Sequence, residues 1–382
     1  MPFLPFALPD ITEAEIEAVA EAMRSGWLTT GPNATAFERE FAEFLGTDAQ
    51  AVAVNSATAG LHLAFEAIGV GPGDEVLVPT WTFTSTAEAV RYLGGDPVLV
   101  DVDPATLCID LADAARKVTG RTVAVAPVHY AGLAVPNAAL TEFAARHGLR
   151  VVEDAAHAFP TVNEGTPVGA HGHAATVYSF YATKTMTTGE GGMVITPDED
   201  LAARMRTMRL HGIDRDVFDR YSSTRPSWHY DVVAPGYKYN LTDTAAAMGR
   251  VQLRRAPEMV ARRTTIAARY DEAFLGLPVT LPARPAEGST HAWHLYNLRL
   301  AADAPVSRDR FIALMAEAGV GTSVHFIPLH LQPYWRDTYG HRPENFPVAT
   351  AQFERSVSLP IFSAMTDDDV EKVVATTAEI LG

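Results

Sequence analysis

Two reactive side chains follow strand-like apolar segments and lie thirty residues apart. Asp154 comes after the apolar run 149–152, and Lys184 comes after the run 176–180. A lysine amine can form a Schiff base with an aldehyde cofactor, and an aspartate can hold a pyridine nitrogen protonated. Pyridoxal phosphate (PLP) chemistry requires both contributions from a protein, so this pair predicts a PLP enzyme.

A third segment could bind the phosphate of that cofactor. The run Asn55-Ser56-Ala57-Thr58 joins a predicted strand to a predicted helix. Free amides in the first turn of a helix form an anion site. Taken alone, this run is more typical of a plain helix cap, Asp154 of a structural anchor and Lys184 of a solvated loop. Their order and their places at strand ends favour a single cofactor site.

The expected secondary structure brings these segments to one edge of a sheet. Apolar runs alternate with helical periods between about 51 and 196, which is typical of a mostly parallel α/β sheet covered on both faces. Ligands of such sheets bind beyond the carboxyl ends of the strands. We expect strands at 51–54, 75–78, 98–100, 123–128, 149–152, 176–180 and 193–196, and helices at 58–68, 84–93 and 137–147.

The flanking segments predict two domains. Amphipathic helices are expected at 11–25, with Ile16, Val19 and Met23 on one face, and at 34–45. Helices at 198–210 and 243–274 enclose a stretch rich in Gly, Pro and aromatic residues, typical of a functional or interface loop. The pattern changes after about 255, with strands at 294–300 and 320–326 and helices at 307–318 and 366–381. We expect a large domain over 1–250 and a smaller C-terminal α/β domain over 251–382.

Composition excludes several classes of function. The 382 residues carry a formal net charge of −16, which argues against a nucleic-acid or anionic-membrane surface. The single cysteine excludes an intrachain disulfide, and the histidine pairs lack the other ligands of a metal site. Dinucleotide and serine-hydrolase motifs are missing, which disfavours a nicotinamide dehydrogenase and a hydrolase. With no signal-peptide pattern and no apolar run of spanning length, we expect a cytoplasmic protein.

Together, these motifs resemble the DegT/DnrJ/EryC1/StrS family of PLP-dependent sugar aminotransferases over nearly the whole chain. The segments that carry the resemblance are 25–32, 56–58, 73–76, 79–83, 100–103, 127–132, 153–158, 184, 189–192, 236–243 and 291–295. Within the family, the chain looks most like the members that make UDP-4-amino-4-deoxy-L-arabinose.

The resemblance implies the aspartate-aminotransferase fold (fold type I), an α/β class with a large PLP-binding domain. Lys184 matches the Schiff-base lysine, Asp154 the partner of the pyridine nitrogen, and His157 the residue near the phenolic oxygen. Phe83 falls where the family stacks an aromatic residue on the cofactor ring.

The resemblance also implies a homodimer whose active sites lie at the subunit interface. The phosphate ligands of the family match Ser56, Ala57, Thr58 and Ser179, together with Lys238 or Asn240 from the other chain. We expect substrate contacts at Thr30, Trp81, His325 and His330.

The implied reaction moves an amino group from glutamate to a keto carbon, C4, of a UDP- or dTDP-linked sugar. A C3-keto sugar is one alternative. Another is a PLP-dependent sugar dehydratase, in which histidine replaces the lysine. A third is a PLP-binding regulator without turnover. The presence of both Lys184 and Asp154 disfavours the last two alternatives.

Overall fold

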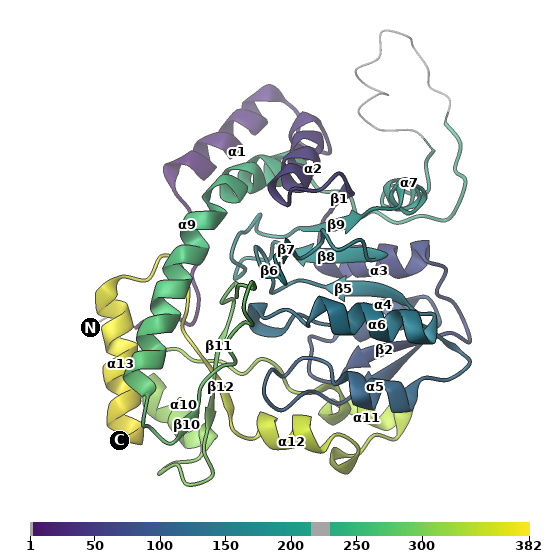
Figure 1. Ribbon diagram of the computed structural model, residues 1–382. Coiled ribbons are helices and arrows are strands. Elements are labelled where there is room, and N and C mark those ends of the chain that lie inside the picture. The colour runs from purple at the N-terminus through teal and green to yellow at the C-terminus, as the bar shows by residue number, and fades with distance from the viewer. Residues whose placement is uncertain (1–2, 215–229) are drawn as a thin grey trace.

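A seven-stranded sheet forms the centre of the computed structural model, which describes residues 3–214 and 230–382 (Figure 1). Its strand order is β1-β9-β8-β5-β4-β2-β3, and β9 alone runs antiparallel to its neighbours. The strands are β1 (Gln50–Val54), β2 (Glu75–Pro79), β3 (Asp96–Val100), β4 (Thr122–Val125), β5 (Arg150–Asp154), β8 (Ala175–Ser179) and β9 (Gly192–Thr196). The prediction of a mostly parallel α/β sheet is therefore confirmed.

Helices cover this sheet because its strands are apolar on both faces. All five residues of β2, β8 and β9 are buried, so neither face can contact water. The covering elements are α3 (Ala57–Ala67), α4 (Ser85–Tyr92), α5 (Leu111–Lys117), α6 (Asn137–His147) and α7 (Glu199–Met208). A short 3-10 turn, η1 (Tyr130–Gly132), and a small hairpin, β6 (Val162–Asn163) with β7 (Thr166–Pro167), lie between α5 and β8 in the sequence.

One long helix, α9 (Asp243–Phe274), links the sheet to the rest of the chain (Figure 1). Helices α1 (Glu13–Ser25) and α2 (Pro32–Phe44) pack against it. On α1, Ile16 and Met23 are 52% and 60% exposed, whereas Glu15 is buried. Polar contacts rather than the apolar stripe therefore fix α1 to its neighbour, which the hydrophobic period could not reveal.

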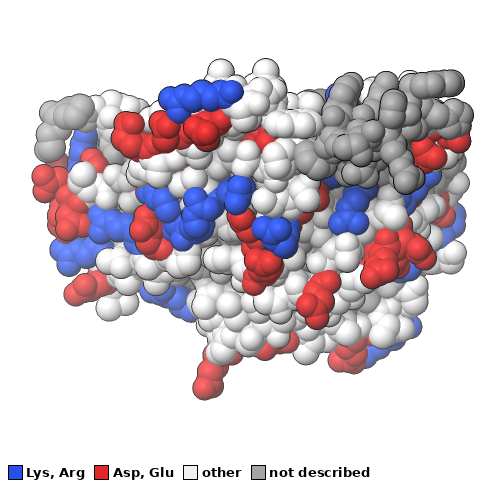
Figure 2. All heavy atoms as spheres, turned by 90° about the horizontal axis from the view of Figure 1, so that it is seen from above, with Lys and Arg blue, Asp and Glu red and all other residues white. Residues whose placement is uncertain are grey.

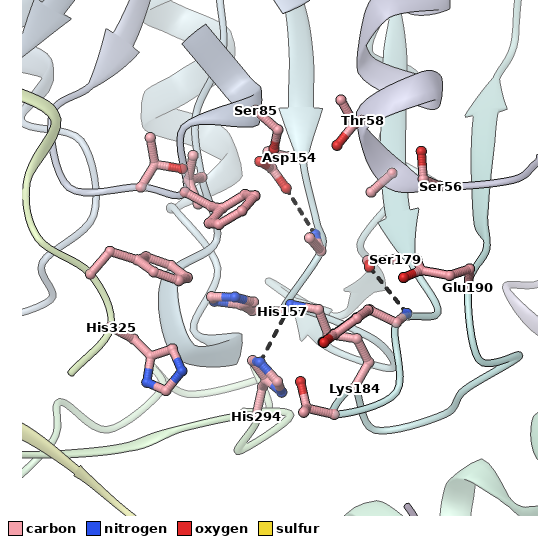
Figure 3. A pocket seen from close by; sticks show the side chains of 18 residues that line it. Ser56, Thr58, Ser85, Asp154, His157, Ser179, Lys184, Glu190, His294 and His325 are labelled. Atoms are coloured by element: carbon pink, nitrogen blue, oxygen red, sulfur yellow. Dashed lines mark hydrogen bonds between the residues drawn. The ribbon is translucent and has the colours of Figure 1, made fainter. Parts of the chain in front are cut away.

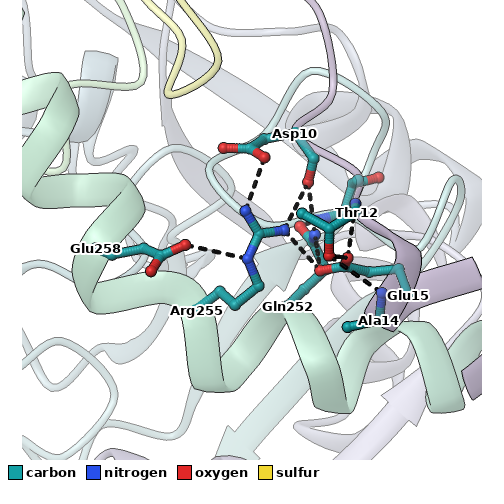
Figure 4. Close-up of polar contacts among 8 residues, drawn as sticks. Asp10, Thr12, Ala14, Glu15, Gln252, Arg255 and Glu258 are labelled. Atoms are coloured by element: carbon teal, nitrogen blue, oxygen red, sulfur yellow. Dashed lines mark hydrogen bonds and ion pairs between the residues drawn. The ribbon is translucent and has the colours of Figure 1, made fainter.

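Those polar contacts surround Glu15 (Figure 4). Its carboxylate accepts hydrogen bonds from the Thr12 amide, from Gln252 and from Arg255, each at 2.8 Å. Burial would raise the pKa of Glu15, but the hydrogen bonds from Thr12 and Arg255 outweigh it and hold the pKa at about 2. A buried carboxylate with several donors stays ionised, so it anchors the start of α1 to α9.

The C-terminal part has a sheet of its own. Strands β10 (Val279–Thr280), β11 (Tyr296–Leu300) and β12 (Ser356–Leu359) pair antiparallel. They pack with α10 (Arg308–Glu317), α13 (Asp367–Leu381) and the second half of α9. The strand expected at 320–326 is wrong. Only isolated bridges form there, from Val320 to Leu4 and from Ser323 to Ser358, because the segment turns toward the large sheet.

The chain then returns to the large sheet. Its elements are η2 (Leu329–Leu331), α11 (Pro333–Tyr339), η3 (Pro343–Asn345) and α12 (Pro347–Phe353). Leu329, Trp335 and Phe346 join the core of that sheet. The expected domain boundary at 250/251 falls inside α9, so the division stays a prediction. The return path carries residues 325 and 326 to the edge of the sheet.

Charge is distributed without a basic stripe on the face seen in Figure 2. Acidic and basic side chains alternate there over the described residues. None of the helices in the described part of the chain is long and apolar enough to cross a bilayer. The same residues contain no group of three His, Cys, Asp or Glu side chains placed to hold a metal ion.

Candidate active site

A cavity of about 440 Å³ opens at the carboxyl ends of the central strands (Figure 3). The structure brings Asp154 at the end of β5, Ser179 at the end of β8 and Lys184 into its wall, together with the start of α3. The other lining residues are Thr82, Phe83, Ser85, Val128, Ala156, His157, Tyr181, Thr183, Glu190, His294, His325 and Phe326. Strand-end residues thus meet in one crevice, as the strand pattern predicts.

The start of α3 forms an anion site at one end of this cavity. Ser56 caps the helix, and its hydroxyl accepts from the Ala59 amide at 3.1 Å. The amides of Ala57 and Thr58 lie in the first turn, where a helix offers no acceptor. Gly192 lies so close that an added Cβ would be 2.9 Å from the Ala57 nitrogen. Because a side chain at Gly192 would crowd this turn, glycine leaves room for an anion at the Ala57 and Thr58 amides and the nearby Ser179 hydroxyl.

Asp154 lies at the base of the cavity with little exposure. One carboxylate oxygen accepts from the Thr86 hydroxyl at 2.7 Å, and the other accepts from the Ala156 amide at 3.0 Å. The Asp154 amide donates to the Pro127 carbonyl at 2.9 Å, which ties it to the segment that follows β4. A carboxylate oxygen can accept more than one hydrogen bond, so Asp154 can still accept one from a ligand in the cavity.

Lys184 approaches the cavity from the loop after β8. Its Nζ lies 3.4 Å from Nε2 of His294. Burial lowers the pKa of Lys184 to about 8, and the nearby charge of Asp154 opposes this effect. A larger fraction of the amine is therefore neutral at physiological pH than for a solvated lysine. A neutral amine can act as a nucleophile or take up a proton.

Three imidazoles complete the wall next to Lys184. Burial, followed by the charge of Lys184, lowers the pKa of His157 and of His294 well below the usual value. Burial also lowers the pKa of His325 to about 4. All three rings are therefore uncharged at neutral pH. With the hydroxyls of Thr58, Thr82, Ser85 and Thr183, they make a wall of neutral polar groups.

Phe83, expected to stack on the cofactor ring, and His325, expected to contact the substrate, both line the cavity. The other residues expected to contact the substrate do not line it. Trp81 is buried, and its Nε1 donates to the His325 carbonyl at 2.8 Å. His330 is also buried, with ring nitrogens 2.7 Å from the Thr80 hydroxyl and 2.9 Å from that of Thr350. In the structure, both residues hold the returning chain to the sheet.

The segment expected to reach a second chain pairs with the end of β1, just before Ser56 in the chain, and the Asn55 amide donates to the Tyr239 carbonyl at 2.8 Å. Lys238 is exposed, and Asn240 donates to the Thr30 hydroxyl at 2.8 Å. Thr30, Lys238 and Asn240 are all described in the structure, and none of them lines the cavity of its own chain. Residues 221–229 of the aromatic stretch lie outside the described residues.

His294, Phe326, Glu190 and Tyr181 were not among the expected site residues. His294 stood out in the sequence only as one of several histidines and as part of the 291–295 motif. It reaches Lys184 through contacts between segments 110 residues apart, which no local spacing shows. The one available signal for Glu190 was its place in the 189–192 motif.

Comparisons with known proteins agree with this geometry. The family model described as "DegT/DnrJ/EryC1/StrS aminotransferase family" matches residues 9–378. The spore coat polysaccharide biosynthesis protein SpsC of Bacillus subtilis is 46% identical over 381 residues, covering 99% of this chain and 97% of SpsC.

Solved structures show the same likeness. The sugar aminotransferase CalS13 from Micromonospora echinospora matches with a TM-score of 0.88 and 32% identity, covering 98% of this chain and 99% of CalS13. The PLP-form of Spr1654 from Streptococcus pneumoniae matches with a TM-score of 0.92 and 32% identity over 100% of both chains. Its PMP-form matches with a TM-score of 0.91 and 33% identity, covering 99% of this chain and 97% of that one.

Proposed function

The chain belongs to the DegT/DnrJ/EryC1/StrS aminotransferase family and is a PLP-dependent sugar aminotransferase, and on that premise we propose its substrates. It moves an amino group from glutamate to C4 of a keto sugar linked to UDP or dTDP. We also propose that the protein is located in the cytoplasm.

The observation that carries this proposal is the chemistry of the cavity wall. One amine, Lys184, and two carboxylates, Asp154 and Glu190, face a space whose other polar side chains are mainly hydroxyls and uncharged imidazoles. Neutral donors and acceptors suit the hydroxyl groups of a sugar ring, whereas a small dicarboxylate alone would call for several cations. The cavity therefore supports a polyhydroxylated substrate that reacts at the amine.

The residues present fit PLP. The amides at Ala57 and Thr58 and the Ser179 hydroxyl provide anion donors, which suit the phosphate. Asp154 provides the carboxylate that a pyridinium proton needs. When bound, PLP supplies an electron sink for the electron pair left at the donor carbon when its proton is removed.

The side chains of the chain then have distinct tasks. Lys184 Nζ would hold the cofactor and, once released, would move the proton from the donor carbon to the cofactor. In the second half-reaction it would move a proton from the cofactor to the sugar carbon that receives the amino group. Asp154 keeps the pyridine nitrogen protonated, because its negative charge favours the cationic ring. Phe83 and Phe326, whose rings are 5.7 Å apart, form an apolar rim that limits the entry of water.

The substrate proposal is tested with a panel of UDP- and dTDP-linked 3-keto and 4-keto sugars and with glutamate as donor. We expect one 4-keto sugar to gain an amino group, detected by mass spectrometry of the products. Amination of a 3-keto sugar only, or loss of water in place of amination, would identify the corresponding alternative. Failure of glutamate to convert bound PLP to the aminated form would instead favour a non-catalytic regulator.

The second part of the proposal is a homodimer with shared sites. The phosphate of PLP is a dianion, yet Lys184 is the one lysine or arginine among the described residues that lines the cavity. Lys238 is exposed at the end of the segment that the family extends to a second chain. We infer that Lys238 or Asn240 of a second copy completes the phosphate site.

Mixing two inactive variants tests the shared site. One variant is Lys184→Ala and the other is Lys238→Ala combined with Asn240→Ala. A heterodimer would hold one site with both defects and one site with neither. Random exchange is then expected to restore about a quarter of wild-type activity, from the half of the dimers that are mixed. Sites built within one chain would restore none once subunit exchange is verified by native mass spectrometry.

A further inference from the structure

We propose that His294 is a positioning residue that holds the Lys184 amine through Nε2 and accepts an N–H when Lys184 carries the proton. The inference rests on the proposed role of Lys184 as the group that moves a proton. Nε2 of His294 lies 3.4 Å from Nζ (Figure 3). Over the described ranges, it is the one side-chain atom within hydrogen-bond distance of Nζ.

The chemistry of an ammonium group decides which ring nitrogen accepts. An ammonium carries three donors and no acceptor, so Nε2 must present its lone pair when Lys184 is protonated. The ring proton then resides on Nδ1, which is buried and has no partner within the described residues. Because burial keeps the His294 ring uncharged, it can serve as an acceptor rather than as a second cation.

The His294 ring is held in place from two sides. It packs on the His157 ring with centroids 4.3 Å apart. The Ala131 amide donates to His157 Nδ1 at 3.2 Å, and the Ala131 carbonyl accepts from the Leu295 amide at 3.2 Å. One turn, η1, thus orients both imidazoles. Gly132 permits this approach, because an added Cβ would be 3.0 Å from the Trp293 nitrogen.

The backbone next to His294 has an uncommon conformation. Trp293 has φ of +51°, in the left-handed region that bulky residues rarely adopt. Its side chain enters the core of the C-terminal part, and the buried Arg263 donates to its carbonyl at 3.1 Å. The turn directs His294 the other way, toward Lys184. Conformations of this kind persist where the surrounding structure requires them, often at functional sites.

Several charged and titratable groups face this pair. The charge of Asp154 raises the pKa of Lys184, and Glu190 lines the same cavity. His157 and His325 face Lys184 as uncharged rings, and Arg263 further disfavours a proton on His294. None of the uncharged rings replaces the acceptor that His294 Nε2 provides. Removing that acceptor alone should therefore change the protonation of Lys184.

The test measures the pKa of Lys184 directly. The enzyme is loaded with pyridoxamine phosphate, so that Lys184 is a free amine, and acetylation of its peptide is followed against pH by mass spectrometry. In His294→Phe the ring remains but the acceptor is lost, and we expect the Lys184 pKa to fall by about one unit. In His294→Gln an amide oxygen can take the place of Nε2, and the pKa should stay close to wild type.

A second measurement distinguishes the positioning of the Lys184 amine by His294 from a purely structural role of His294 in folding. The glutamate half-reaction should lose rate in His294→Phe with little change in KM and recover in His294→Gln. His171→Gln, outside the cavity, should leave both readouts unchanged. If His294→Phe does not fold, His294→Asn tests the same loss, because its shorter amide does not reach Nζ. An unaltered Lys184 pKa in the folded variant would overturn the inference. The proposed function is judged separately, because it stands as long as the wild-type enzyme itself transaminates.

Discussion

Replacing Lys184 with alanine is expected to lower transamination by roughly 10⁴- to 10⁶-fold, since the covalent attachment and the proton transfer depend on one group. The neighbouring imidazoles cannot substitute for it, because only a primary amine can form a Schiff base with the aldehyde. The measurement is the rate at which glutamate converts bound PLP to its aminated form, followed by absorbance. PLP should still bind, because the phosphate site and Asp154 are intact.

Borohydride reduction of the wild-type enzyme provides the chemical control. The chain has only four lysines, at 117, 184, 238 and 372. Lys117 donates to the Leu99 carbonyl and Lys372 to the Gly319 carbonyl, each at 2.9 Å. Peptide mapping should therefore place the reduced cofactor on Lys184. A label on Lys238 instead would exclude Lys184 as the attachment site.

Replacing Asp154 with asparagine is expected to lower turnover by about 10²- to 10⁴-fold while PLP remains bound. Asparagine keeps the size of the side chain, and its carbonyl oxygen can still accept one of the present hydrogen bonds. It lacks the negative charge that holds a proton on the pyridine nitrogen, so the cofactor accepts electrons less well in the transition state. Stopped-flow absorbance of the glutamate half-reaction measures the loss.

The same variant should change the pH dependence. The charge of Asp154 raises the pKa of Lys184, so its removal should bring that pKa below about 8. The acidic limb of the activity profile is then expected to move to lower pH. Asp154→Glu, which keeps the charge but changes its position, serves as the matched control and should leave that limb near its wild-type position. Turnover close to wild type in Asp154→Asn would remove Asp154 from the mechanism.

Local sequence patterns predicted most elements of the large sheet. The expected segments at 51–54, 137–147 and 243–274 correspond to β1, α6 and α9 within one residue. Fully buried strands read as short apolar runs, and amphipathic helices have a period close to 3.6 residues. Both signals depend on neighbours in the chain, so they survive without knowledge of the fold. Lys184 and Asp154 could be proposed as a pair because reactive side chains at strand ends converge in a sheet of this kind.

The same local signals failed where packing between distant segments decides. The apolar residues Ile16 and Met23 suggested a buried face of α1, yet Glu15 is buried because Arg255 and Gln252 meet it from α9. The segment 320–326 is apolar enough to suggest a strand. Its carbonyl at His325 instead accepts from Trp81, and no continuous ladder forms.

The sequence by itself indicated the α/β class and the cofactor chemistry, and it led to the proposal that Lys184 and Asp154 carry that chemistry, because apolar runs and the residue types at their ends are local signals. Only the tertiary structure decided which histidines face the cavity. His330 is bonded to Thr80 and Thr350 away from it, whereas His294 is carried to Lys184 by α9 and the second sheet. Residue type and local spacing do not show which histidine faces a cavity. Their role depends on contacts between segments more than a hundred residues apart. These segments meet because the core of the large sheet and the core of the C-terminal part are each packed from distant parts of the chain.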